Sequence, residues 1–277
     1  MQLRLLIKKN LGTADHGNIS SKFRGTGNDF DDHSPYNPGD DFKDIDWNIY
    51  ARTEQLFVKK YLQAKYFSLT IFIDLSASML CGKPSKSSAA KRLAAGLAYL
   101  FLHNGCSIQI GIVQNNHILY SKQYRHYKYI KDILNFLSRQ KPQGQQNLKT
   151  AIKKITKKSQ LCILCSDFLH AKDSFAFIQQ LAIKNKCLLL HILSREEVTT
   201  PFNGKLVLED IENREKITIN IDNDVRKKYL KEVQDFRQNW QSFATRNRIP
   251  YYFTLNDKSI ARTIVNSLQM AKFLSTD

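Results

Sequence analysis

Three oxygen-bearing side chains stand at alternate positions directly after one apolar segment. The segment, residues 67–73, is rich in β-branched and aromatic residues, and Asp74, Ser76 and Ser78 follow it. An uninterrupted apolar run of this kind is typical of a buried parallel strand. In open α/β sheets, ligands bind beyond the carboxyl ends of the strands. One carboxylate and two hydroxyls are hard donors, which suit Mg²⁺ or Mn²⁺ better than Zn²⁺ or copper.

The same residues allow two other interpretations. Asp74 could cap the turn after the strand while the serines only solvate a loop. Alternatively, Asp74 could be the aspartyl nucleophile of a hydrolase that transfers a phosphoryl group. Such a phosphatase usually carries a second acid two residues on, where this chain has Ser76. The Gly82-Lys83 pair does not complete a P-loop, because the next residue is Pro84 rather than serine or threonine.

A second acidic cluster precedes Trp47, with four aspartates in seven residues. These carboxylates could hold a metal ion or pair with cations further along the chain. Because Ile45 lies between the acids and Trp47 directly follows them, we expect ion pairs within a fold rather than a metal site. The expected structural ion-pair block consists of Asp40, Asp41, Asp46, Arg52 and Lys59.

Length and composition set the broad class. A chain of 277 residues with 42% hydrophobic residues can form one large domain, or one domain with an appendage. No apolar run is long enough to span a membrane, and the start does not resemble a signal peptide, so we expect a cytoplasmic protein. Cys162 and Cys165 lie in a predicted strand, where this spacing points them to opposite faces. We therefore expect all five cysteines to be free thiols.

The formal net charge of +17 is unevenly distributed. Residues 122–158 contain eleven lysines and arginines against one acid, Asp132. A basic face attracts nucleic acid, anionic lipid or an acidic protein, although it can also be a solvated helical face. A nucleic-acid-binding module that uses this stretch is therefore a second hypothesis, which no nucleic-acid motif in the sequence supports.

Beyond residue 66, predicted strands alternate with predicted helices. The strands are expected at residues 67–73, 107–114, 161–166, 186–193 and 250–254, with 117–121 antiparallel to its neighbour. The helices are expected at residues 87–104, 127–139, 148–158, 174–184, 222–246 and 259–274. Two alternating runs within residues 198–221 predict a hairpin. This alternation predicts a mostly parallel α/β sheet flanked by helices, whereas the start of the chain is typical of short strands and loops.

Several motifs are spread over most of the chain. They are Tyr36-x-Pro38-Gly39-Asp40-Asp41, Ile45-Asp46-Trp47, Ala51-Arg52, Val58-Lys59, Asp74-x-Ser76-x-Ser78-Met79, Ser166-Asp167-Phe168, Pro201, Gly204, Leu208-x-Asp210 and Arg226-x-x-Tyr229. In these motifs the chain resembles the domain of unknown function 58 family, proteins with a von Willebrand factor A-like domain that are associated with MoxR-type AAA+ ATPases.

The resemblance implies both an architecture and a role. It implies a von Willebrand factor A-like (Rossmann-like) domain at residues 67–277, with a hairpin insertion at about residues 198–221, and an N-terminal β-rich extension at residues 1–66. It also implies a non-enzymatic protein-binding adaptor. Such an adaptor would work with a MoxR-type AAA+ ATPase in the maturation or remodelling of other client proteins, so nucleic acid is not the expected partner.

The resemblance also implies a metal-ion-dependent adhesion site. In such sites Mg²⁺ is held by the aspartate and two serines of the first loop, a threonine of a second loop and an aspartate of a third. Here these ligands are Asp74, Ser76, Ser78 and Asp167, while Gln146 stands where the threonine would be. We therefore expect a site for Mg²⁺ or Mn²⁺ that binds weakly. Nearby lysines are expected to add positive charge at the rim: Lys83, Lys86 and Lys141.

Overall fold

The computed structural model describes residues 4–5, 30–61, 67–115, 117–144, 159–169, 171–209 and 216–275. The chain divides into two compact units, one formed by residues 11–66 and the other by residues 67–277 together with the first ten residues. Gln146, Asp210 and the predicted helix at residues 148–158 lie outside the described residues.

The larger unit contains a six-stranded sheet with the order β11-β8-β7-β4-β5-β6. Its strands are β4 (Ser68–Asp74), β5 (Ser107–Gln114), β6 (His117–Tyr120), β7 (Leu161–Ser166), β8 (Lys186–Leu193) and β11 (Tyr251–Leu255). All neighbours are parallel except the edge strand β6, which is antiparallel to β5. The first strand, β4, lies inside the sheet, and the strand order reverses between β4 and β7. This topology confirms the predicted von Willebrand factor A-like fold.

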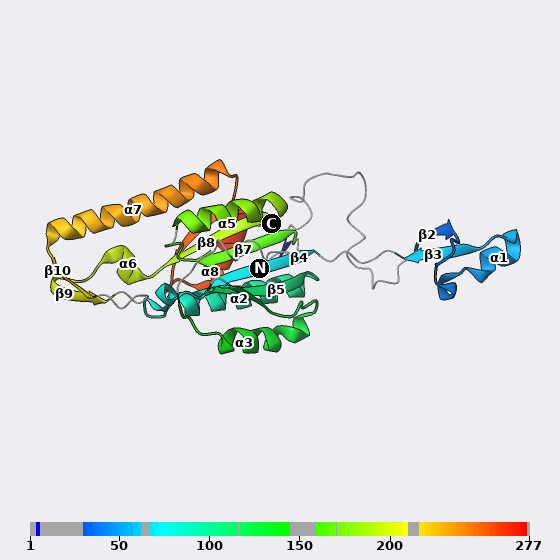
Figure 1. Cartoon of the computed structure of the whole chain (residues 1–277), viewed down its shortest axis with the longest axis horizontal. Helices are drawn as coiled ribbons and strands as arrows, with labels where there is room; N and C mark the ends of the chain where they lie inside the picture. The colour runs from blue at the N-terminus through cyan, green and yellow to red at the C-terminus, as the bar shows by residue number, and fades with distance from the viewer. Residues whose placement is uncertain are drawn as a thin grey trace. The chain divides into compact units, whose positions relative to one another are not determined.

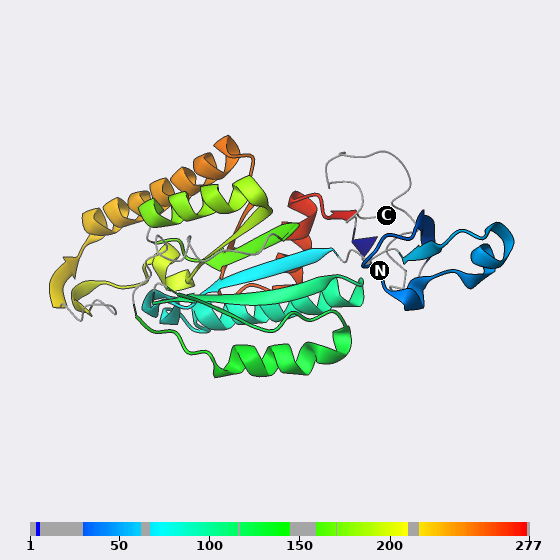
Figure 2. The same cartoon turned by 45° about the vertical axis from the view of Figure 1, so that its right-hand side comes forward.

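Helices cover both faces of this sheet (Figures 1 and 2). One face carries α5 (Ala171–Lys184) and α7 (Asn223–Arg246), and the other carries α2 (Lys86–His103), α3 (Ile130–Arg139) and α8 (Ile260–Met270). The helix α2 begins where the Ser85 hydroxyl accepts the Ser88 amide, and it ends before Gly105 at a positive φ of 75°. Its buried alanines, among them Ala90 and Ala94, allow it to pack closely on the sheet.

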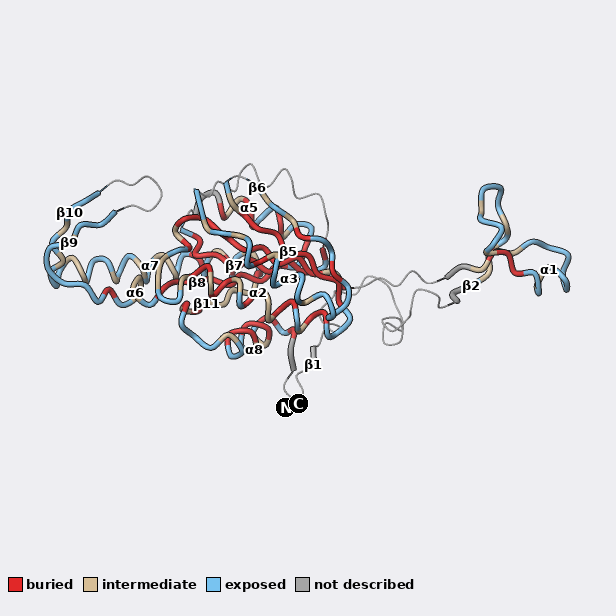
Figure 3. Tube along the Cα trace, turned by 90° about the horizontal axis from the view of Figure 1, so that it is seen from below, coloured by how far each residue is buried: buried red, intermediate tan, exposed pale blue. Residues whose placement is uncertain are grey.

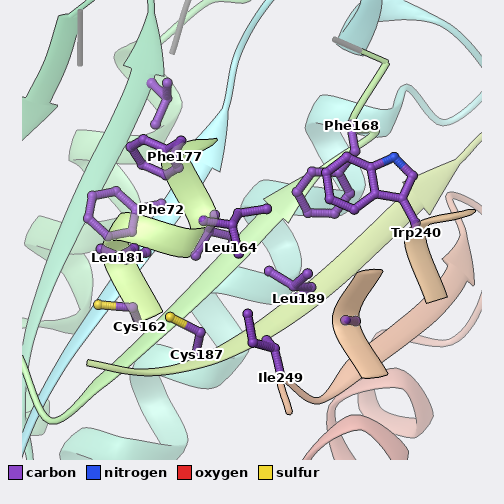
Figure 4. Close-up of a cluster of buried hydrophobic side chains, with 13 residues drawn as sticks. Phe72, Cys162, Leu164, Phe168, Phe177, Leu181, Cys187, Leu189, Trp240 and Ile249 are labelled. Atoms are coloured by element: carbon purple, nitrogen blue, oxygen red, sulfur yellow. The ribbon is translucent and has the colours of Figure 1, made fainter. Parts of the chain in front are cut away.

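Aromatic and aliphatic side chains together fill the core between the sheet and the layer of α5 and α7 (Figure 4). Trp240 of α7 is fully buried, and its ring centre lies 4.5 Å from that of Phe168 and 4.4 Å from that of Phe175. Phe168 immediately follows Asp167 in the chain. The core therefore anchors the loop that follows β7, because this loop cannot shift without moving a buried ring.

The hairpin is smaller than predicted. A short helix, α6 (Arg195–Thr199), takes up residues 198–199, which we expected in a strand. The Ser194 hydroxyl accepts the Glu197 amide while the Glu197 carboxylate accepts the Ser194 amide, and this capping box favours a helix start. The strands β9 (Gly204–Glu209) and β10 (Lys216–Ile221) then pair antiparallel, and most of their residues are exposed (Figure 3).

Two short strands correct the expected extent of the N-terminal extension. The strand β1 (Arg4–Leu5) pairs antiparallel with β12 (Leu274–Ser275) near the other end of the chain. The start of the chain therefore belongs to the larger unit, because main-chain hydrogen bonds to β12 hold it there. Among the described residues, no helix combines the length and apolar character required to cross a bilayer.

The smaller unit is described from residue 30 to residue 61. Its strand β2 (Phe30–Pro35) pairs antiparallel with β3 (Phe57–Tyr61). Between them lie a single 3-10 turn at residues 42–44 and the helix α1 (Trp47–Thr53), which the sequence analysis did not predict. The described part of the β-rich extension is thus a two-stranded sheet with a helical connection.

Candidate functional site

The predicted site residues of the first and third loops meet at the carboxyl edge of the sheet. Asp74 ends β4 and Asp167 follows β7, which lies parallel to β4 with Ile73 opposite Cys165. The Asp74 carboxylate accepts the Ser76 amide on Oδ1 at 2.9 Å. Its other oxygen, Oδ2, accepts the Ser166 hydroxyl at 2.6 Å. Parallel neighbours end at the same edge, so the sheet itself brings these two acids together.

The two serines connect the two acids. The Ser76 and Ser78 hydroxyl oxygens lie 3.0 Å apart, and the Ser78 hydroxyl donates to Asp167 Oδ2 at 2.8 Å. The loop that precedes the predicted ligand Gln146 borders this cluster, because the carbonyl of Gly144 accepts the Ala77 amide at 3.0 Å. Four of the five predicted ligands thus form one hydrogen-bonded cluster, and the fifth lies outside the described residues.

A buried lysine, which the sequence analysis placed at the rim, completes this cluster. The Lys86 side chain is fully buried, with Nζ 2.8 Å from Asp167 Oδ2 and 2.6 Å from Glu197 Oε1. Burial alone would lower the pKa of Lys86, but the negative charges of Asp167 and Glu197 raise it above its ordinary value. Lys86 therefore adds its positive charge inside the cluster rather than at the rim, because the first turn of α2 lies over the acids. Glu197 was missed altogether.

Negative charge exceeds positive charge within this cluster. Burial first, and then the charge of Asp167, raise the pKa of Asp74 to about 6, against hydrogen bonds from Ser166 and Ser76 that lower it. Three carboxylates (Asp74, Asp167 and Glu197) face one ammonium group, which leaves a surplus of two negative charges when all are ionised. Two carboxylates and two hydroxyls with this surplus fit a hard divalent cation.

The hydroxyls are essential to that fit. Within the described residues, no group of three or more His, Cys, Asp or Glu side chains could hold a metal ion. An ion bound here would therefore depend on Ser76, Ser78 and water for part of its coordination, beside the carboxylates of Asp74 and Asp167. The fifth predicted ligand, Gln146, lies outside the described residues.

Two potentially reactive side chains close to the site are poor catalysts. Burial raises the pKa of the Cys165 thiol to about 12, so it is protonated at neutral pH. Burial, as the largest cause, lowers the pKa of His191 to about 3. The imidazole Nδ1 lies 2.6 Å from the Tyr251 hydroxyl, and four aromatic rings surround it: those of Phe168, Phe236, Tyr251 and Phe253. Both residues serve the core.

The predicted ion-pair block of the smaller unit is only partly formed. Asp46 is buried, and its Oδ2 lies 3.5 Å from Lys59 Nζ, as expected, and 2.9 Å from His33 Nε2, which was not. Asp40 and Asp41 instead make local contacts, with the Asn37 amide and with Lys43 respectively.

Arg52 is not a member of this block, and its predicted pairing with the aspartates is wrong. The guanidinium is exposed, and its Nε donates to the carbonyl of Asn48 at 3.2 Å. Asp46 caps α1, and Arg52 follows six residues later on this helix, more than one and a half turns away. The helix thus carries Arg52 to a different side from the buried carboxylate.

The strand order and the sheet-edge cluster define an α/β domain of the von Willebrand factor A type. The profile of a family described as "Protein of unknown function DUF58" matches residues 32–239. The chain belongs to this family, which confirms the resemblance. One relative, "Uncharacterized protein Rv1480" of Mycobacterium tuberculosis (strain ATCC 25618 / H37Rv), is 23% identical over 225 residues, which cover 76% of this chain and 69% of the relative.

Solved structures are also similar to this chain. "Conserved hypothetical protein BatB" from Bacteroides thetaiotaomicron superposes with a TM-score of 0.46 at 16% identity, covering 74% of this chain and 98% of that one. The "SpRpn10 VWA domain" superposes with a TM-score of 0.41 at 9% identity, covering 74% of this chain and 96% of that one.

Proposed function

We propose that this protein is a non-enzymatic adaptor that binds other proteins through the sheet-edge cluster of Asp74, Ser76, Ser78 and Asp167. The observation that carries the proposal is the convergence of these four side chains at the switch point of the sheet, with negative charge in surplus. The protonated Cys165 and the core imidazole of His191 support a binding role over a catalytic one.

The binding we propose depends on Mg²⁺ or Mn²⁺. The ion would be held by Asp74, Ser76, Ser78 and Asp167, with Gln146 as a weak further ligand. When bound, it supplies positive charge and a coordination position that a carboxylate of the partner can take. Without it, Lys86 neutralises Asp167 and keeps the loop after β7 in place.

We further propose a MoxR-type AAA+ ATPase as the partner, with other proteins as clients of the pair. This part rests on the family resemblance, because the geometry of the site specifies only an acidic group on the partner. The basic stretch at residues 122–158 is described only as far as Gly144, and nucleic-acid binding by it stays a prediction.

Co-purification from the native host tests the proposal. Wild type and Asp74→Asn are recovered with and without EDTA, at low and at high salt. We expect an AAA+ ATPase with the wild type, lost with EDTA and with Asp74→Asn, and reduced only moderately by salt. A nucleic-acid binder would ignore EDTA and release its ligand between roughly 50 and 200 mM salt. Recovery of nucleic acid without an ATPase would contradict the adaptor function.

A further inference from the structure

A cavity of about 710 Å³ lies beside the sheet-edge cluster. Its walls come from the loop that follows Ser78, including Leu80 and Lys83, from α6, from the β9–β10 hairpin and from the start of α7. Figure 1 shows the hairpin and α6 together near the beginning of α7. The volume is within the range of roughly 300–1,000 Å³ that is usual for ligand sites.

The hairpin turns an apolar face toward this cavity. Ile217 lies opposite Leu208 and Ile219 opposite Leu206, so these side chains share one face of the two-stranded sheet. Val207 points to the other face. Leu208 and Ile219 line the cavity, yet Leu208 is 50% exposed. The apolar face is therefore incompletely covered, which is typical of a surface that receives a partner.

Three residues that line the cavity each have a buried polar atom without a hydrogen-bond partner among the described residues: Glu196 Oε2, Thr200 Oγ1 and Arg226 Nε. Buried polar atoms are usually paired. The set combines an acceptor, a hydroxyl and a donor, which matches the N–H and C=O groups of a polypeptide main chain. A purely apolar ligand, such as an acyl chain, would leave all three unpaired.

The charges at the cavity favour an acidic ligand. Lys83 lines the cavity and is exposed, and no carboxylate of the described residues pairs with it. Of the two carboxylates that line the cavity, Glu197 is already matched by Lys86, and the charges of Lys83 and Arg226 together exceed the single charge of Glu196. Four residues from the family motifs also line this cavity, and the sheet-edge cluster uses none of them: Pro201, Leu208, Arg226 and Tyr229.

We propose that this cavity binds a segment of a partner protein in which a large apolar side chain stands next to an acidic residue. The apolar side chain packs against Leu208 and Ile219, the main chain pairs with Arg226 and Glu196, and the acid lies near Lys83. The proposal rests on the proposed adaptor function and extends it to a second contact. Glu197 lines the cavity and shares Lys86 with Asp167, so the two contacts are physically connected.

A random dodecapeptide library displayed on phage provides the probe. The full chain is panned against the library, and enriched peptides are synthesised and titrated by fluorescence anisotropy. We expect enriched sequences to pair an apolar residue with aspartate or glutamate. Leu208→Glu should weaken their binding by about tenfold or more, since it places a charge on the apolar wall. The matched control Val207→Glu, on the opposite face of the same strand, should bind like the wild type.

A second variant keeps the test valid if Leu208→Glu disturbs the hairpin. Lys83→Glu changes an exposed side chain, and it should weaken acidic peptides while improving binding of the same peptides with lysine in place of the acid. Equal binding to Leu208→Glu and Val207→Glu would overturn the proposal. So would the absence of enriched sequences, binding of decanoate but not of peptides, or self-association of the chain through this face.

The outcome is separable from that of the proposed function. Peptide binding depends on Leu208 and Lys83, whereas recovery of the ATPase depends on Asp74 and on EDTA. If Leu208→Glu removes peptide binding, the cavity proposal is supported. If EDTA does not change the yield of the ATPase in the same study, the metal-dependent site is contradicted. If Leu208→Glu leaves peptide binding unchanged while EDTA lowers the yield of the ATPase, only the cavity proposal is overturned.

Discussion

Two buried aspartates, one in each unit, differ in how their charge is balanced. In the smaller unit, Asp46 accepts the amides of Asn48 and Ile49 on Oδ1, while His33 and Lys59 face Oδ2. The hydrogen bond from His33 is the largest of the causes that lower the pKa of Asp46 to about 2. In the larger unit, burial and a second carboxylate raise the pKa of Asp74 to about 6.

The difference distinguishes a buried carboxylate whose charge the fold matches from one whose charge the fold leaves unmatched. The negative charge of Asp46 is balanced within the fold, because a cation and the amides at the start of α1 both contact the carboxylate. Among the described residues, Asp74 has only hydrogen bonds from Ser76 and Ser166, and Lys86 contacts Asp167 rather than Asp74. Buried charge that the fold leaves unmatched is typical of a site where a ligand supplies the balance.

The largest effect is expected at Lys86, the one cation that contacts the site acids within the described residues. Lys86→Met should lower the free energy of unfolding of the larger unit by about 3–5 kcal/mol, because it leaves Asp167 and Glu197 buried without their cation. Urea denaturation followed by Trp240 fluorescence in a Trp47→Phe background measures this unit alone, because these are the two tryptophans of the chain.

The exposed residue Arg92, on the same helix, provides the control. Arg92→Met should change the free energy of unfolding by less than about 0.5 kcal/mol. A loss below about 1 kcal/mol for Lys86→Met would show that the acids do not need this cation. The charge imbalance that we infer for the acids of the larger unit would then be wrong, and the contrast with Asp46 would no longer hold.

A smaller and local effect is expected at Asp46. Asp46→Ala removes the cap of α1, so the amide hydrogens of Asn48 and Ile49 should exchange with solvent faster than in the wild type. Hydrogen exchange measured residue by residue detects the change. Arg52→Ala, which alters only an exposed side chain, should leave the same exchange rates unchanged. Faster exchange in Arg52→Ala would instead indicate that Arg52 stabilises the start of α1, as a member of the predicted ion-pair block would.

Acid should weaken the same helix start. The folded pKa of Asp46, about 2, lies below its ordinary value of 3.8, so the charged form is favoured by folding. The stabilisation is complete above about pH 4 and is lost as the pH falls through about 2. A titration of the Asp46 carboxyl carbon by NMR measures this pKa directly. A pKa near the ordinary value would mean that His33 and Lys59 do not stabilise the carboxylate.

The sequence predicted the location of Asp74 and Asp167 better than it predicted their surroundings. Asp74 and Asp167 were predictable because each follows an apolar run, and parallel strands bring such ends to one edge. Lys86 was not, since a lysine in the first turn of a helix is usually solvent-exposed, and its position depends on how α2 lies over the sheet. Glu197 comes from a different helix, and only its capping box with Ser194 was visible in the sequence.

The smaller unit shows which elements could not be predicted from the sequence. The helix α1 has seven residues, too few for apolar periodicity to identify it, although Asp46 is a suitable N-cap. Without that helix, Arg52 looked close to the acids, because separation along the chain says little about direction until the helical turn is known. Long, strongly apolar elements were therefore predictable, whereas short capped ones were not.

Titration of the chain with Mg²⁺ by calorimetry is the most direct test of the proposal that the sheet-edge cluster binds a divalent cation. The matched variants are Asp74→Asn and Asp46→Asn, which remove one negative charge from each cluster and keep the size of the side chain. We predict binding heat for the wild type and for Asp46→Asn, none for Asp74→Asn, and tighter binding for Gln146→Thr. No heat with the wild type at millimolar Mg²⁺ or Mn²⁺, or equal binding by Asp74→Asn, would contradict the account.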